Sequence, residues 1–197
     1  MLTSHTKTLL VALCVTIIGG CAHPIAIAPD FNAVQAPAAQ VTAKKAAYYI
    51  SDEDRAREVT TPGGGGDKVR YFPYRDLEAG LYKVLSATFA SIAKLNKAPD
   101  NEELNRQGIV VVVTPRITTH SSSDSIVTWP PTSFTVELEC RISDPTGAEL
   151  AQARIVGFGN ASFDEFKSDF ALAGKRASAD ALNKLANTLA TLPALKD

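Results

Sequence analysis

The side chains most able to do chemistry together stand at 120–125, where the chain reads His-Ser-Ser-Ser-Asp-Ser. A base, several hydroxyl groups and an acid are the side-chain types of a nucleophilic hydrolase. In such enzymes the three groups come from separated segments of a rigid frame, whereas here they follow one another in one polar stretch. The chain also contains no Gly-x-Ser-x-Gly motif. We therefore expect a serine-rich loop at His120 and not a catalytic triad.

Metal and nucleotide sites are not predicted either. Structural zinc needs about four ligands at recognised spacings, and Cys140 with His23 and His120 does not supply them. Four consecutive glycines, Gly63 to Gly66, invite comparison with a phosphate-binding loop. The Gly-Lys-Ser/Thr that would open a helix is missing, because Asp67 and Lys68 lead into an extended segment. We expect a mobile loop and no bound cofactor.

Glu137 and Glu139 are the remaining acid pair of interest. They lie two residues apart on an alternating segment, so both face solvent from one side of a strand. Nothing in that setting favours the separated pKa values that glycosidase chemistry requires. The chain is therefore expected not to be an enzyme.

The stretch Leu9–Cys21 carries the clearest motif. Leu9 to Ile18 is uncharged and follows Lys7, and about ten apolar residues are too few to span roughly 30 Å of hydrocarbon, so we interpret residues 1–20 as a secretory signal. Ile18-Gly19-Gly20-Cys21 then resembles the lipobox of bacterial lipoproteins. The resemblance implies that Cys21 receives a diacylglycerol and becomes the acylated amino terminus, so that the chain takes up palmitate. An ordinary signal peptide cleaved after a small residue is the alternative.

The composition after residue 20 limits the partners. The 177 remaining residues suffice for one domain, and their 19 basic and 21 acidic side chains give a net charge of −2. This balance argues against general nucleic-acid binding and against attraction to anionic head groups. Ala22, not Asp, follows the cysteine. By the same resemblance this implies an outer-membrane anchor with the domain at the periplasmic face.

The pattern predicts three parts: a signal at 1–20, a lipidated Cys21 with a flexible, proline-bearing tether at 21–40, and a single periplasmic α+β domain at 41–197. The alternative for part of the tether, around Ile25 to Ile27, is a short strand added to a sheet edge. Hydrophobic periodicity predicts the elements of that domain. These are a strand at 41–50, a short helix at 51–57, a helix at 76–97, a strand at 109–113, a hairpin of 134–142 with 149–159, and a helix at 168–192.

Three details of this pattern bear on the packing. The unbroken run at 109–113 indicates a central strand covered on both faces, which Thr114 and Pro115 end or turn toward an edge. Gly157 and Gly159 indicate a bulge or a close contact. A stripe of small residues lets the last helix lie close to a sheet; its members are Ala173, Ala177 and Ala181. We expect a small, mainly antiparallel sheet with two main helices on one face.

This layout is similar to that of the YajG-type lipoproteins and of the amino-terminal domain of TolB, a fold also used by penicillin-binding-protein activators and transport-auxiliary lipoproteins. The resemblance covers roughly residues 41–192 and has no diagnostic motif. It implies work through contacts with envelope proteins and not catalysis.

The leading hypothesis is therefore a binding or scaffolding subunit of a cell-envelope assembly. The alternative is a ligand-binding auxiliary lipoprotein of a transport system, which would need an apolar cavity between helix and sheet. Candidate surfaces are the solvent face of the sheet, a free strand edge, the loop at Gly63–Gly66 and the loop at 129–131. The candidate contact residues are Trp129, Pro130, Tyr71 and Tyr74. The two tyrosines also fit a second interpretation, in which they fasten a loop onto the core.

Overall fold

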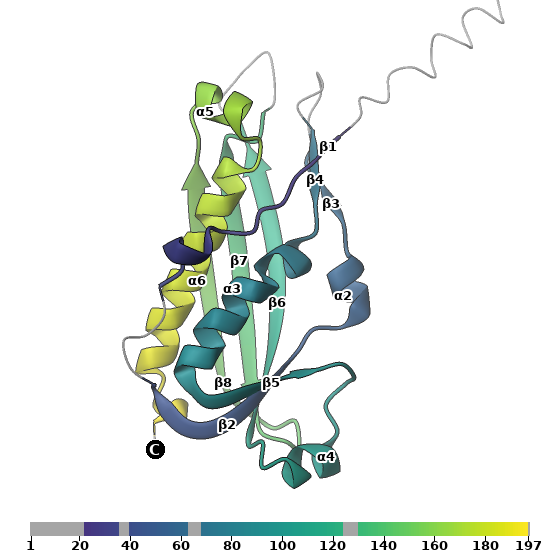
Figure 1. Cartoon of the computed structure of the whole chain (residues 1–197), viewed down its shortest axis with the longest axis vertical. Coiled ribbons are helices and arrows are strands. Elements are labelled where there is room, and N and C mark those ends of the chain that lie inside the picture. Colours follow the sequence, from purple (N-terminus) through teal and green to yellow (C-terminus); the bar gives the residue numbers. More distant parts are fainter. Residues whose placement is uncertain (1–21, 36–39, 63–67, 124–129, 197) are drawn as a thin grey trace, which may run out of the picture.

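The computed structural model describes residues 22–35, 40–62, 68–123 and 130–196. A five-stranded sheet forms one layer, and helices α3 and α6 cover one of its faces (Figure 1). The α+β class is therefore confirmed. In chain order the elements are β1 (His23–Pro24), η1 (Phe31–Ala33), β2 (Thr42–Tyr49), α2 (Asp52–Ala56), β3 (Val59–Thr60), β4 (Val69–Tyr71), α3 (Pro73–Thr88), β5 (Phe89–Leu95), α4 (Asn101–Arg106), β6 (Val111–Ser122), β7 (Ser133–Ser143), β8 (Glu149–Asn160), α5 (Phe163–Ser168), α6 (Leu172–Thr191) and η2 (Pro193–Leu195).

The main sheet has the order β5-β2-β6-β7-β8. The long strands β6, β7 and β8 are antiparallel, as the alternating pattern at 134–142 predicts, whereas β2 runs parallel to both β5 and β6. The turn between β7 and β8 joins the two strands of the predicted hairpin. Gly147 has a φ of 87° there, and its N–H donates to the carbonyl oxygen of Asp144 at 3.0 Å.

Of the two outcomes expected at Thr114 and Pro115, the second is found: the strand does not end but becomes an edge on one side. β6 continues to Ser122, and Pro115 pairs with Cys140 of β7. β2 pairs with β6 only as far as Val113. Beyond that point, no described strand pairs with the side of β6 that faces away from β7. The N–H of Ile117 points to this side and donates to the hydroxyl of Tyr74 at 3.1 Å. Pro115 is two residues before Ile117, so the backbone nitrogen of Pro115 also faces away from β7. The N–H that proline lacks would therefore not have bonded β7, and no hydrogen bond between the two strands is lost.

The close contact suggested by Gly157 and Gly159 is confirmed, and its partner is α6. A Cβ at either position would overlap backbone atoms of α6 at Ala173, Ala177 and Ala181. These three alanines are almost completely buried. Small residues on both surfaces thus let the helix axis approach the sheet closely.

The helix predicted for 76–97 is wrong at its carboxyl end. α3 ends at Thr88, and Phe89–Leu95 form the edge strand β5 beside β2. The hydroxyl of Thr88 donates to the carbonyl oxygen of Val84 at 2.9 Å at this last turn. The apolar stripe continues through Phe89 and Ile92 because both still pack on the main core. Burial was therefore predicted correctly while the secondary structure was not.

The valine run of β6 is covered on both faces, as predicted. Val111 and Val113 belong to the main core beneath the helices. Val112 faces the other way, into a small second cluster with Ala47, Leu104 and Ile109, which α4 closes. Val110 is 46 % exposed at the start of the strand. Val110 and Val112 point to the same side, but only Val110 is exposed, so the two valines do not form an exposed apolar patch.

Residues 22–35, which we call the strap, pack against the domain, so the prediction of a flexible tether is wrong for this part. The strap begins as β1 beside β4 and then crosses α3 and α6 (Figure 1). Ile27 and Val34 are at most 1 % exposed and belong to the main core. The N–H of Ile27 donates to Oδ2 of Asp76 in α3 at 3.0 Å. The amide group of Asn183 in α6 bonds the backbone at positions 33 and 35.

Asp76→Ala is expected to loosen the strap. The buried N–H of Ile27 would lose its acceptor, which costs about 1–3 kcal/mol of unfolding free energy. Burial raises the pKa of Asp76, so a neutral group of the same shape suits the site. Asp76→Asn should therefore stay within about 1 kcal/mol of wild type. Urea unfolding and amide exchange at position 27 measure both effects; equal losses in the two variants would contradict the assignment.

Candidate functional site

One face of the sheet is not covered by α3 or α6. Alternate residues of β6, β7 and β8 point away from the helices, and those beyond Val112 are mostly half-buried or exposed. The set comprises Thr114, Arg116, Thr118, His120, Thr135, Glu137, Glu139, Arg141, Gln152, Arg154, Val156 and Phe158. We call this surface the open face.

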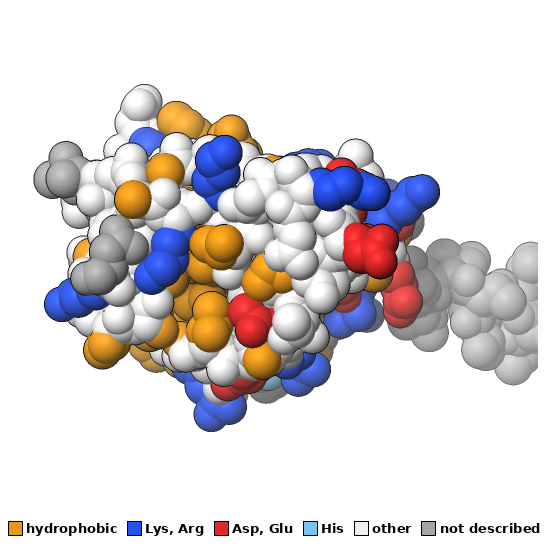
Figure 2. Space-filling view, turned by 90° about the horizontal axis from the view of Figure 1, so that it is seen from below, with side chains coloured by type: hydrophobic (Ala, Val, Ile, Leu, Met, Phe, Trp, Pro, Cys, Tyr) orange, Lys and Arg blue, Asp and Glu red, His pale blue; other side chains and the backbone are white. Residues whose placement is uncertain are grey.

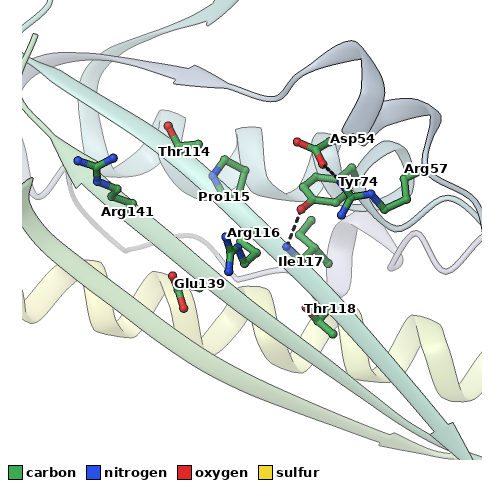
Figure 3. Close-up of a pocket in the computed structure, with 10 residues that line it drawn as sticks. All are labelled: Asp54, Arg57, Tyr74, Thr114, Pro115, Arg116, Ile117, Thr118, Glu139 and Arg141. Atoms are coloured by element: carbon green, nitrogen blue, oxygen red, sulfur yellow. Dashed lines mark hydrogen bonds and ion pairs between the residues drawn. The ribbon is translucent and has the colours of Figure 1, made fainter. Parts of the chain in front are cut away.

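A groove of about 630 Å³ lies where the open face meets the segment that contains α2 (Figure 3). Its floor is formed by residues 114–118 of β6, and Glu139 and Arg141 of β7 line it as well. Asp54 and Arg57 form the opposite wall, with Tyr74 between. The free side of β6 beyond Val113 makes room for this groove, because β2 has ended there.

The charges along the groove are neutralised in pairs, with one exception. Arg57 pairs with Asp54 at 2.7 Å, Arg141 with Glu149 at 3.3 Å, and Glu139 with Arg154 at 3.4 Å.

Arg116 is that exception. It lies directly opposite Glu139 in the β6–β7 register, and Figure 3 shows the two side chains close together. Nevertheless, Arg116 makes no ion pair with any residue that the structure describes. Its guanidinium is thus a cation with five donors, free to bind a carboxylate or another planar anion.

The wall that contains Asp54 and Arg57 is held by a half-buried acid. Glu78 of α3 accepts hydrogen bonds from the hydroxyl of Tyr48 at 3.0 Å and from Arg55 at 3.1 Å, and it pairs with Nζ of Lys94 at 2.9 Å. Burial alone would raise the pKa of Glu78, but the bonds from Arg55, Lys94 and Tyr48 outweigh it and lower that pKa to about 2. Through Arg55, this cluster fixes α2 to α3, β2 and β5.

A second, smaller groove of about 180 Å³ continues across the open face toward β8. It shares Arg116, Thr118 and Glu139 with the first groove and reaches Val156. Val156 and Phe158 are 42 % and 59 % exposed. The open face therefore combines an unpaired cation in its middle with apolar side chains along β8.

The edge of β8, a candidate site for strand addition, is partly occupied by α6. Nζ of Lys184 donates to the carbonyl oxygen of Val156 at 2.9 Å, and the N–H of Phe158 donates to Asp180 at 2.9 Å. Nη1 of Arg176 donates to the carbonyl oxygen of Asn160 at 2.6 Å. These three side chains, one helical turn apart, bond the outer backbone groups of 156–160. A partner strand would meet free backbone groups only nearer Glu149.

The candidate contact residues named from the sequence do not gather on this surface. Tyr71 and Tyr74 are 1 % and 2 % exposed; Tyr71 bonds the hydroxyl of Thr119 at 2.7 Å, and Tyr74 accepts from Ile117. Both tyrosines therefore fasten their segment to the core, and Tyr74 also lines the first groove. Pro130 is buried as well. Trp129, Cys21 and the loop at Gly63–Gly66 lie outside the described residues.

The side chains considered for catalysis also have other surroundings. Nε2 of His120 lies 3.5 Å from Glu137 on the open face, and both side chains are more than half exposed. Cys140 is completely buried, and burial raises the pKa of its thiol to about 12. Among the described residues no group of three His, Cys, Asp or Glu side chains is placed to hold a metal ion.

Ser91 and Lys94 have the Ser-x-x-Lys spacing, which pairs a nucleophile with a base in some hydrolases. The spacing does this at the start of a helix, where residues three apart share one face. Here both residues lie in β5, where residues three apart point to opposite faces. Lys94 is bound to Glu78 instead.

A third groove of about 480 Å³ lies at the end of the molecule that carries α4. Figure 2 views the molecule from this side and shows hydrophobic side chains in a hollow between charged ones. Ala93, Leu95 and Leu104 line the groove, with charged residues such as Lys97 and Arg106 around them.

No helix among the described residues is both long and apolar enough to cross a membrane.

Comparison with known proteins gives a likeness of fold. No family model and no curated protein matches the chain. Among solved structures it is similar to the protein XCC0632 of family DUF330 from Xanthomonas campestris, with a TM-score of 0.51 and 11 % identity over 84 % of this chain and 90 % of that one. A minor lipoprotein from Acinetobacter baumannii gives a TM-score of 0.38 at 10 % identity, covering 75 % and 92 % of the two chains. A PelC dodecamer from Paraburkholderia phytofirmans gives 0.38 at 15 %, covering 77 % and 95 %.

At such identities the likeness to XCC0632 concerns the fold alone, and the two lower scores carry no further weight. The acylation of Cys21 therefore stays a prediction from its motif.

Glu78→Gln tests the electrostatic support of the groove wall. The pKa of Glu78 lies near 2 in the folded protein and near 4.5 when unfolded, so ionised Glu78 stabilises the fold above pH 4.5. This stabilisation is lost as the pH falls from 4.5 to 2. At pH 7 the variant should lose on the order of 2 kcal/mol of unfolding free energy, and the difference from wild type should shrink toward pH 2. A difference that stays constant across this range would contradict the role.

Cys140 should not react with a maleimide in the folded protein at pH 7.5, because its thiol is buried and protonated. Mass spectrometry should show full modification at this position after unfolding in urea. Modification of the folded protein at the rate of an exposed thiol would contradict the assignment.

Proposed function

We propose that this chain is a lipoprotein of the cell envelope, anchored in the outer membrane through Cys21 with its domain at the periplasmic face. In this proposal it works without catalysis, as a binding or scaffolding subunit of an envelope assembly. The open face is the surface that receives the protein partner.

The anchoring part of the proposal is supported by the sequence. An uncharged leader of signal length ends in Ile18-Gly19-Gly20-Cys21, the arrangement of the lipobox. Two or more acyl chains hold a protein firmly on a bilayer, whereas a single chain binds only marginally.

The single observation that carries the binding part is the unpaired Arg116 in the groove of the open face. The neighbouring arginines Arg57, Arg141 and Arg154 each have an acidic partner, and Arg116 has none among the described residues. A carboxylate of the partner would form two parallel hydrogen bonds with its guanidinium. Thr114 and Thr118 flank Arg116 along β6 and offer hydroxyl groups to the same ligand. We therefore expect the partner to present an acidic segment.

A contact of this kind suits the exposed apolar side chains beside it. Val156 and Phe158 lie at the β8 side of the open face, so a segment that crosses the strands would meet the cation first and then the apolar residues. Arginine is enriched among the few interface residues that dominate binding energy.

The alternative function, binding an apolar ligand between helix and sheet, has less support. That interface is filled by fully buried side chains, among them Leu138, Ile142, Leu182 and Leu185. The three grooves described above open on the outer surfaces instead.

Site-specific photocrosslinking in living cells tests the proposal. A photoreactive residue at Thr118 should form a discrete adduct with an envelope protein. Arg116→Glu should reduce that adduct about tenfold or more, since loss of a central contact costs roughly 2 kcal/mol or more and the new acid repels the partner. Arg116→Lys should retain part of it, because the charge stays while the two-pronged geometry is lost.

The matched control is Lys97→Glu, which makes the same charge change at the α4 end, away from the open face. It should leave the adduct unchanged. An adduct at Thr118 that is insensitive to Arg116→Glu, or no adduct at all in the presence of correctly folded protein, would contradict the assignment of the open face.

A further inference from the structure

The ordered strap leaves almost no spacer between the domain and a lipid on Cys21. His23 is already in β1, where its N–H donates to the carbonyl oxygen of Lys68 at 2.7 Å. The N–H of Ile25 donates to the carbonyl oxygen of Arg70 at 2.9 Å. Two residue steps separate Cys21 from His23, so their Cα atoms are at most about 7 Å apart. An acyl group on Cys21 would therefore hold β1 itself close to the head groups.

The surface beside β1 contains an exposed aromatic side chain. The ring of His23 lies 4.8 Å from that of Phe170, which in turn lies 4.9 Å from Phe166 of α5. Phe163, at the start of α5, is 50 % exposed. Figure 1 shows β1 and α5 at the same end of the molecule, opposite α4. We call this the β1–α5 end.

The charges at this end suit a lipid surface. Each acid of the α5 region has a basic partner at 2.8 Å: Asp164 with Lys167, Glu165 with Arg176, and Asp169 with Lys175. Among the described residues from Phe163 to Phe170, no acid is left without a basic partner to repel head groups. Nζ of Lys167 lies 5.0 Å from the centre of the Phe163 ring, so this side chain can keep its charge in the head-group layer while the ring enters deeper.

We propose that the β1–α5 end rests on the bilayer leaflet that anchors Cys21, with Phe163 in the interface. This inference rests on the lipid anchor of the proposed function and adds an orientation to it. β6, β7 and β8 run along the long axis from this end toward α4 (Figure 1). Twelve residues of β6 span about 40 Å, so α4 stands roughly that far from the membrane. The open face is then a side wall, accessible to a partner in the periplasm.

Fluorescence quenching by lipids tests this orientation in the full, acylated chain. Cys140 is buried and Cys21 is acylated, so a new surface cysteine is the reactive one in the folded protein. Asp164→Cys places a fluorophore next to Phe163, and Asn105→Cys places one on α4. The proteins are reconstituted into vesicles of phosphatidylethanolamine and phosphatidylglycerol that carry nitroxide head groups.

We expect quenching at position 164 at least about threefold stronger than at position 105. Phe163→Glu should remove most of that difference, because a charge does not enter the interface. A twelve-residue Gly-Ser insertion after Ala22 should lower it as well, because the domain is then free to leave the surface. Equal quenching at the two positions, or quenching at 164 that neither change affects, would overturn the orientation.

Two further readouts separate the possible failures. Incorporation of radiolabelled palmitate is measured on the same samples; its absence would overturn the lipid anchor and the orientation together. Palmitate incorporation with equal quenching would overturn the orientation alone and leave the open face as a binding surface untouched. Shielding of position 164 in native envelopes but not in vesicles would show that a protein covers this end, which also contradicts the proposal.

Discussion

The close approach of α6 to β8 is the contact on which the architecture depends. Gly157 and Gly159 leave no side chain between the strand and the helix backbone at Ala173 and Ala177. Any larger residue there would push the helix outward and open the main core beneath it. Because α6 lies so near the strand, its charged side chains can bond the outer edge of β8 at residues 156–160. One contact therefore both packs the core and closes much of one sheet edge.

The same arrangement leaves most of the opposite face of the sheet uncovered by helices. Both long helices are on one side, and the short helix α4 covers only the small cluster around Val112 and Leu104. Beyond that cluster the alternating residues of β6 and β7 face solvent. The groove between them and the segment after Ile50 depends on Glu78, which ties Arg55 to the neighbouring elements. Partly buried ion pairs thus shape the groove on the open face.

Much of the fold follows from local pattern. The alternation at 134–142, the Asp-Pro-Thr-Gly turn and the alanine stripe of the last helix each predict a contact that the structure contains. The helix boundary at Thr88 could not be predicted, because Phe89 and Ile92 continue the helical stripe while the sheet requires an edge strand there. The strap was missed for a similar reason. Its prolines and alanines suggest a loose chain, and only the groove between α3 and α6 makes Ile27 and Val34 core residues.

The candidate site was only partly predictable. Glu137 and Glu139 were correctly placed on the solvent face from alternation alone. Arg116 was missed because Pro115 was taken to end or redirect the strand. The alternation Thr114, Arg116, Thr118 is present in the sequence and would have placed the arginine on the same face. Tyr71 and Tyr74 look like binding residues in the sequence because their hydroxyl partners, Thr119 and the N–H of Ile117, are more than forty residues away.

The most direct test of this account is the unfolding free energy of Gly157→Ala and Gly159→Ala, measured by urea denaturation. Overpacking of a close contact costs about 1–3 kcal/mol, and backbone overlap lies at the upper end of that range, so each variant should lose about 2 kcal/mol or more. The bonds from α6 to the edge of β8 should weaken with it, as faster amide exchange at Phe158. A loss below about 0.5 kcal/mol, typical of an uncritical surface position, would show that the sheet does not depend on this contact.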